Sequence, residues 1–126
     1  MEKERGIKER KSLLKQVLAI VLADGKIEPS EREFLNDFCV RYGIQASELE
    51  EVARYPEKVE LVIPVDHETK LADLGELVCA MSVDGEITGG EYGLCKLCAT
   101  VYGLSERSFE QAMEHYIRKY NLNLNI

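Results

Sequence analysis

Apolar side chains recur along this chain with the period of an α-helix. Between roughly residues 7 and 23, four of them fall at positions i, i+3, i+4 and i+7: Leu14, Val17, Leu18 and Val21. This spacing gives one apolar stripe and predicts a first helix. Similar patterns predict a second helix from about Pro29 to Tyr42 and a short third helix near residues 46 to 54.

After Pro64 the helical pattern begins again. It predicts a fourth helix with Asp66 as its N-cap, a fifth through residues 94–101 and a sixth through residues 109–120. The residues after 120 are expected to form a trailing tail. Between the halves, a short helix begun by Pro56 is favoured over an extended link for residues 57–63. No stretch alternates apolar and polar residues long enough to predict a strand.

The two halves of the chain carry the same short pattern sixty residues apart. Asp-Gly-x-Ile-x-x-x-Glu runs from Asp24 to Glu31 and again from Asp84 to Glu91. Such a repeat predicts two related structural units. We expect a single domain over residues 1–126, with repeat halves at about 7–54 and 66–120.

The expected fold is an all-α, compact bundle of about six to seven helices, built from two helical hairpins related by a pseudo-twofold axis. The hairpins share one core because neither half has enough apolar surface to bury alone. The aligned stripes predict the residues of that core: Leu14, Val17, Leu18, Phe34, Phe38, Leu74, Val78, Leu94, Cys98, Phe109, Met113 and Ile117.

Helix capping alone can account for the repeated motif. A glycine after the aspartate adopts a positive φ at little cost and ends the preceding helix. Thr88 and Glu91 have the spacing of a capping box, in which each side chain accepts from the other residue's backbone N–H. In the first copy, Pro29 and Glu31 occupy the first and third helical positions.

The same motif also matches positions 5, 6, 8 and 12 of an EF-hand calcium loop. Position 1 of that loop would fall on Ile20 and Ala80, which carry no oxygen ligand, so a true EF-hand is not expected. A weaker site for Ca²⁺ or another divalent cation stays open, with a dissociation constant of about 0.1 to 1 mM. Its candidate ligands are the acidic residues that both copies of the motif share: Asp24, Glu31, Asp84 and Glu91.

Two such turns between amphipathic helices, each followed by Tyr-Gly at the end of the next helix, resemble the tellurite-resistance protein family TerB and its relatives. The resemblance covers roughly residues 11–118 and is most specific from Pro64 to Leu104. It implies an all-helical, non-enzymatic adaptor linked to tellurite resistance and chemical stress. It also implies divalent-cation binding at the acidic positions and a membrane-associated protein partner.

The sequence departs from that family at Gly89, Gly90 and Gly93, within the expected fifth helix. Each interior glycine costs a helix about 1 kcal/mol relative to alanine. We therefore expect the backbone to approach another part of the molecule, or a ligand, closely at this point.

A CxxC pattern from Cys95 to Cys98, with two further cysteines, raises the alternative of a zinc or redox site. The repeat argues against it, because these two positions align with Leu35 and Phe38, which face the expected core. Buried, reduced cysteines are the favoured interpretation.

Composition narrows the classes of function. The 126 residues are 45% hydrophobic and 31% charged, with a formal net charge of −7. An acidic chain is a poor match for nucleic acid, whose binding depends on neutralising phosphates. The chain has no apolar run of the ~20 residues that span a bilayer and no secretory signal, so a cytoplasmic location is expected.

Two functions remain open from the sequence. The first is a TerB-like stress-response adaptor that acts through its acidic turns. The second is a helical protein-interaction or dimerisation module, including a homodimer, in which those turns only cap helices. No catalytic motif is present, so an enzyme is not expected.

Overall fold

The computed structural model describes residues 6–125, apart from Asp24, Lys26 and the side chain of Asp84. In this part of the chain there are six α-helices: α1 (Ile7–Val21), α2 (Pro29–Tyr42), α3 (Ala46–Arg54), α4 (His67–Met81), α5 (Gly89–Val101) and α6 (Glu106–Tyr120). Two short 3-10 helices, η2 (Pro56–Lys58) and η3 (Ser82–Asp84), and two strands, β1 (Glu86–Thr88) and β2 (Asn123–Asn125), complete it. The predicted all-α fold is confirmed.

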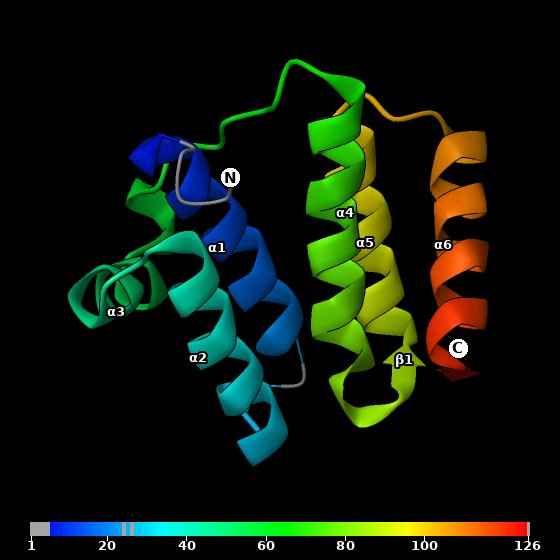
Figure 1. Ribbon diagram of the computed structural model, residues 1–126, viewed down its shortest axis with the longest axis horizontal. Coiled ribbons are helices and arrows are strands. Elements are labelled where there is room, and N and C mark those ends of the chain that lie inside the picture. Colours follow the sequence, from blue (N-terminus) through cyan, green and yellow to red (C-terminus); the bar gives the residue numbers. More distant parts are fainter. Residues whose placement is uncertain (1–5, 24, 26, 126) are drawn as a thin grey trace.

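The two halves of the repeat form the two sides of the molecule. Figure 1 shows α1, α2 and α3 on one side and α4, α5 and α6 on the other. Helices α1 and α4 pack against each other at the centre, and α1 also contacts α5. The core therefore lies between the halves. In the described part of the chain, no helix combines the length and apolar character needed to cross a membrane.

Most of the predicted core is buried. The residues confirmed as fully buried are Leu14, Val17, Leu18, Phe38, Leu74, Val78, Phe109 and Met113. The other four predicted members are only partly buried but pack against that core: Phe34, Leu94, Cys98 and Ile117.

Gly43 ends α2 as predicted, whereas α1 and α4 end before the motif glycines, with Leu22 and Ser82 as their C-caps. Gly43 follows α2 with φ 64°, and the two motif glycines, Gly25 and Gly85, have φ 87° and 80°. All three values lie in the left-handed region that glycine adopts at little cost. Asp66 caps α4 by accepting from the Thr69 backbone N–H at 2.9 Å, also as predicted.

The predicted helix over residues 57–63 is wrong beyond Lys58, where η2 ends. The following link is extended and lies on α1. The Val62 N–H donates to Ser12 Oγ at 2.9 Å, and Lys15 Nζ donates to the Val59 carbonyl at 3.1 Å. An extended link spans more distance per residue than a helix, and the proline at 64 disfavours helical geometry in the residue before it.

The predicted trailing tail is also wrong, because it forms a strand. β2 pairs in parallel with β1, with Ile87 opposite Leu124. Asn121 turns the chain after α6 with φ 52°, a left-handed conformation that asparagine tolerates better than most residues. Leu122 then packs against the core. A three-residue pair has no alternation long enough to read from sequence.

The close backbone approach expected at the α5 glycines is not found at Gly90 or Gly93, the two of these glycines whose surroundings are described. A Cβ added at Gly90 or Gly93 would meet nothing within 4 Å. The close approach occurs instead at Gly75 in α4, where a Cβ would lie 2.6 Å from the Tyr116 Oη of α6. Glycine at 75 thus lets α6 pack tightly on α4.

Candidate functional site

The second acidic turn is held by a reciprocal capping box at the start of α5. The Thr88 N–H donates to Glu91 Oε1 at 2.9 Å, and the Glu91 N–H donates to Thr88 Oγ1 at 3.2 Å. Glu91 is only 8% exposed. Its carboxylate therefore has a structural role at the helix N-terminus, where negative charge is also favoured by the helix dipole.

The first acidic turn repeats this arrangement with a different N-cap residue. The Glu28 N–H donates to Glu31 Oε1 at 2.8 Å, and the Glu28 side chain accepts from the Glu31 backbone in return. Glu31 is also 8% exposed, and Pro29 occupies the first helical position as predicted. The two predicted caps are both present.

The remaining predicted cation ligands cannot be placed. Asp24 lies outside the described residues, as does the side chain of Asp84. Across the described side chains, no group of three or more His, Cys, Asp or Glu residues is arranged to hold a metal ion. Cation binding at the two turns thus stays a prediction.

A second cluster, which the sequence analysis missed, joins α2 to α4. Glu76 accepts two bonds from Arg41, at 2.7 and 3.0 Å, and a third from Tyr42 Oη at 2.8 Å. The Glu76 side chain is 12% exposed. The hydrogen bonds to Glu76 and to the nearby Asp37 carboxylate raise the pKa of Arg41, so the guanidinium stays charged.

A related cluster joins α5 to α1 and α4 in the core. Tyr102 Oη donates to Asp73 Oδ2 at 2.7 Å and accepts from Gln16 Nε2 at 3.0 Å. All three residues are buried. Burial, and then the Asp73 charge, raise the pKa of the Tyr102 hydroxyl. The hydroxyl therefore remains a donor at physiological pH.

The two clusters are repeat equivalents. At the sixty-residue offset, Tyr42 aligns with Tyr102 and Gln16 aligns with Glu76. Each tyrosine thus crosses from the second helix of its own half to the first helix of the other half. The signal was present in the sequence as two aligned pairs, but only the fold shows that they interact.

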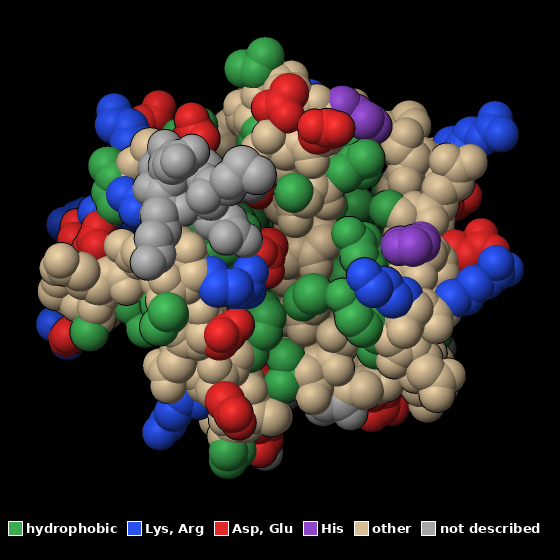
Figure 2. Space-filling model, in the orientation of Figure 1, with side chains coloured by type: hydrophobic (Ala, Val, Ile, Leu, Met, Phe, Trp, Pro, Cys, Tyr) green, Lys and Arg blue, Asp and Glu red, His purple; other side chains and the backbone are tan. Residues whose placement is uncertain are grey.

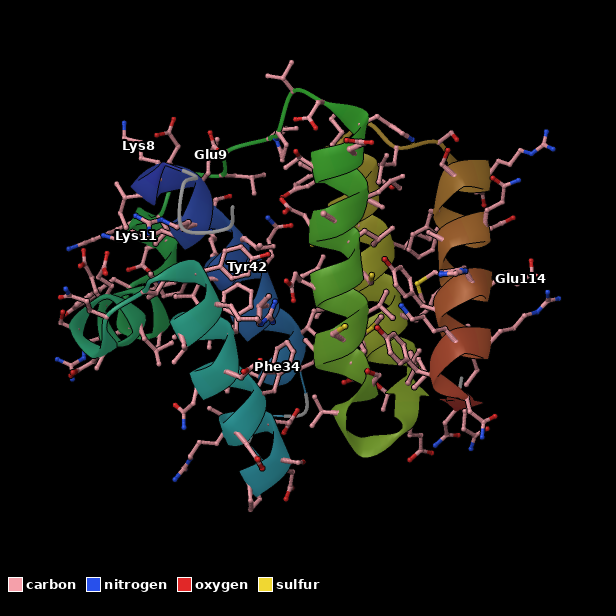
Figure 3. All side chains as sticks on the ribbon, viewed as in Figure 1. Lys8, Glu9, Lys11, Phe34, Tyr42 and Glu114 are labelled. Carbon is pink, nitrogen blue, oxygen red and sulfur yellow. The ribbon has the colours of Figure 1, made fainter. Side chains whose placement is uncertain are left out.

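A surface groove lies over α4 between α2 and α6. It has a volume of about 440 Å³, and we call it the α4 groove. It is lined by residues of all three helices: Phe34, Asp37 and Arg41 of α2, Ala72, Gly75, Glu76 and Cys79 of α4, and Tyr116, Lys119 and Tyr120 of α6. Figure 3 shows Phe34 and Tyr42 on the side of α2 toward α4.

The cysteines do not form a reactive pair. All four are free thiols. Burial raises the pKa of Cys95 and of Cys98, so neither has the lowered pKa of a reactive or metal-binding thiolate. The buried, reduced cysteine predicted at position 95 is confirmed, whereas Cys98 is only partly buried.

No family model matches this chain, and no curated protein matches it. A solved structure that it resembles is the crystal structure of a protein of unknown function from Porphyromonas gingivalis W83. The two chains are 26% identical and superpose with a TM-score of 0.60, over 90% of this chain and 97% of the other. Over that part of the chain, the fold is therefore similar to an experimentally determined one.

Proposed function

We propose that this chain is a non-enzymatic helical interaction domain, an adaptor of the TerB-like type, in which the acidic turns cap helices. The observation that carries the proposal is the engagement of both motif glutamates. Glu31 and Glu91 each accept the N–H of their N-cap residue through Oε1. The glutamate of an EF-hand instead gives both carboxylate oxygens to the ion, so capping and bidentate ligation compete for the same group.

The surroundings of the nucleophilic side chains support a non-enzymatic role. The Cys95 thiol is buried, and its raised pKa keeps it protonated. The Tyr102 hydroxyl is likewise buried and bonded on both sides. Groups of this kind hold helices together but do not reach a substrate.

Weak cation binding is the second candidate, favoured by the matching geometry of the turns. Gly25 and Gly85 have nearly the same φ, and the N–H of each donates to the carbonyl three residues earlier at 2.9 Å. If a cation binds, it is expected to bind both turns with a dissociation constant of about 0.1 to 1 mM.

A titration with calcium and then magnesium, followed by backbone amide NMR, separates the two candidates. Under the capping proposal, the amides of residues 23–31 and 83–91 show no saturable shifts at millimolar ion. Saturable shifts confined to both turns, and abolished by Glu31→Gln and Glu91→Gln, would contradict it. The amides of α3 serve as the internal reference for nonspecific salt effects.

The resemblance adds a biological setting to the proposal: a cytoplasmic protein of the tellurite or chemical-stress response, with a membrane-associated protein partner. Survival on tellurite of a sensitive bacterium that expresses the chain tests this setting. Equal survival with and without the chain would count against it, while leaving the structural role of the turns unaffected.

A further inference from the structure

We propose that the α4 groove binds a second copy of this chain, with the two copies facing each other across a twofold axis that lies between their α4 helices and runs parallel to them. The inference rests on the proposed function as an interaction domain and names its partner. It depends on three properties of the groove: its floor, the charges of its two walls, and the absence of any covering segment among the described residues of the chain itself.

Small and aromatic residues make up much of the lining of the groove. Ala72 is exposed on α4, and Gly75 lets the Tyr116 ring lie close to the helix. Tyr116 and Tyr120 stack in parallel, with ring centroids 6.1 Å apart, and Phe34 is only half-buried on the α2 side. Figure 2 shows hydrophobic side chains gathered over this part of the molecule.

The two walls of the groove carry opposite charge. On the α2 wall, Asp37 is 69% exposed at its side chain, and Glu33 lies one turn before it on the same side of the helix. Arg41 pairs with Asp37 and also with Glu76 of α4, so these three residues carry one net negative charge between the α2 wall and the floor.

The α6 wall presents Lys119, which is exposed and has no carboxylate within ion-pair distance among the described residues. Its ammonium instead lies 5.4 Å from the centroid of the Tyr120 ring. The neighbouring Arg118 pairs with Glu114, which points away from the bundle on the outer side of α6 (Figure 3). Lys119 is therefore the charge that the α6 wall offers to a partner.

A second copy fits this charge arrangement better than a partner of one sign. A twofold axis between the two α4 helices, and parallel to them, sets the α2 wall of each copy against the α6 wall of the other, so both acidic–basic contacts form at once. A uniformly acidic or basic partner would meet one attractive and one repulsive wall. Small residues on the floor also allow two α4 helices to approach.

The repeat-equivalent surface on α1 shows how the chain covers such a groove when it does so itself. There, Ser12 and Lys15 hold the extended link through the backbone of Val62 and Val59. The equivalent positions on α4 are Ala72 and Gly75, which have no polar side chain to hold a link. Within the described residues, no segment of the chain lies over the α4 groove, and its lining remains accessible.

Charge reversal tests the proposal on the intact chain by sedimentation equilibrium from roughly 10 µM to 1 mM. Asp37→Lys and Lys119→Glu are each expected to weaken self-association about tenfold or more, because each places like charges opposite one another at both walls. An equimolar mixture of the two variants is expected to associate again. In the mixed dimer the two substituted positions face each other with opposite charges, and the two unaltered side chains, Asp37 and Lys119, form the other contact.

Two further variants keep the test decisive. Ala72→Arg fills the floor at an exposed helical position, so the chain is expected to fold and to remain monomeric. Arg107→Glu makes the same charge change as Lys119→Glu at the far end of α6, and self-association should be unaffected. Circular dichroism and thermal unfolding verify that each variant is folded.

A wild-type chain that stays monomeric over this range overturns the proposal, as does a dimer that Ala72→Arg leaves intact. A dimer weakened by both reversals but not restored by mixing also overturns it, because the twofold pairing requires rescue. None of these outcomes depends on the acidic turns. The NMR titration therefore tests the capping proposal separately from the dimer.

Discussion

The two crossing tyrosines hold equivalent places in the two halves of the molecule, yet their surroundings differ. Tyr102 lies in the core and joins the neutral amide of Gln16 to the buried carboxylate of Asp73. Tyr42 joins its helix to Glu76 at the edge of the α4 groove, where Arg41 completes an ion pair. Both tyrosines are buried, so the repeat preserves a contact between the halves, while the partner in the other half changes from the neutral Gln16 to Glu76, which is paired with Arg41.

This difference has a physical reason. A charged pair inside the core would lose its hydration, and the attraction within the pair often does not repay that loss. At the groove, the pair keeps part of its hydration and can be charged. The two clusters thus differ most at the α4 groove, where one half carries an ion pair that the other half lacks.

The largest expected effect compares the equivalent positions 38 and 98. Phe38 is fully buried and stacks on Tyr42 with ring centroids 4.5 Å apart. Phe38→Ala should lower the free energy of unfolding by about 3 to 5 kcal/mol through lost burial and a residual cavity. Cys98→Ala should cost about 1 kcal/mol. Urea denaturation measures both, and equal costs would show that the halves contribute equally to the core at this position.

The next comparison removes each crossing hydroxyl. Tyr102→Phe takes a donor from buried Asp73 and an acceptor from buried Gln16, so it should cost about 1 to 3 kcal/mol. Tyr42→Phe leaves Glu76 with both bonds from Arg41 and should cost about 0.5 to 1.5 kcal/mol. Tyr55→Phe, at an exposed position, is the control. A larger loss of stability for Tyr42→Phe than for Tyr102→Phe would show that the Tyr42 hydroxyl makes the stronger contact.

The buried thiols predict that the free energy of unfolding depends on pH, and that the thiols of the two halves contribute differently to this dependence. Burial raises the pKa of Cys95, whereas in the unfolded chain a thiol ionises near pH ~8.5. Above that pH the unfolded state binds fewer protons than the folded state, so stability falls as pH rises. One fully protected thiol contributes a slope of up to about 1.4 kcal/mol per pH unit.

Unfolding at pH values from 7 to about 10 compares the wild-type chain with Cys95→Ala and Cys39→Ala. The Cys95 variant should lose more of the alkaline slope, because Cys95 is fully buried and Cys39 is less so. Stability of both variants below the thiol pKa serves as the baseline. Parallel wild-type and Cys95→Ala curves would mean that Cys95 ionises equally in both states.

The smallest effect concerns the two caps. Glu91→Gln and Glu31→Gln keep an oxygen that can accept the N-cap N–H, so each should change stability by only a few tenths of a kcal/mol. Glu91→Ala removes the acceptor and should cost about 1 kcal/mol. Thermal unfolding with and without millimolar calcium supplies the measurement. Calcium-dependent stabilisation that disappears in either Gln variant would favour the cation site over capping.

Local sequence signals located the helices well because their causes are local. α2 begins at Pro29 and ends at Tyr42, as predicted. The signals for both ends, a proline at the first helical position and a glycine after the last, lie within the helix or next to it in the sequence. The capping boxes followed from a spacing of three residues. The α4 N-cap followed from one side chain and one nearby amide.

The parts that were missed depend on contacts between distant residues. The β2 strand exists because Leu122 and the β1 backbone are brought near the end of α6. The close approach at Gly75 depends on where Tyr116 lies, forty-one residues later in the chain. Neither partner is visible from the residues around it.

The sequence by itself determined the all-helical fold, the duplication, the two capped turns and most of the buried core. These follow from hydrophobic period, backbone preferences of proline and glycine, and short-range hydrogen bonds. Only the tertiary structure decided that Tyr42 and Tyr102 cross between halves, that the link lies extended on α1, and that the α4 groove stays open between oppositely charged walls. Such features arise from packing of residues far apart in the chain, which a linear pattern does not encode.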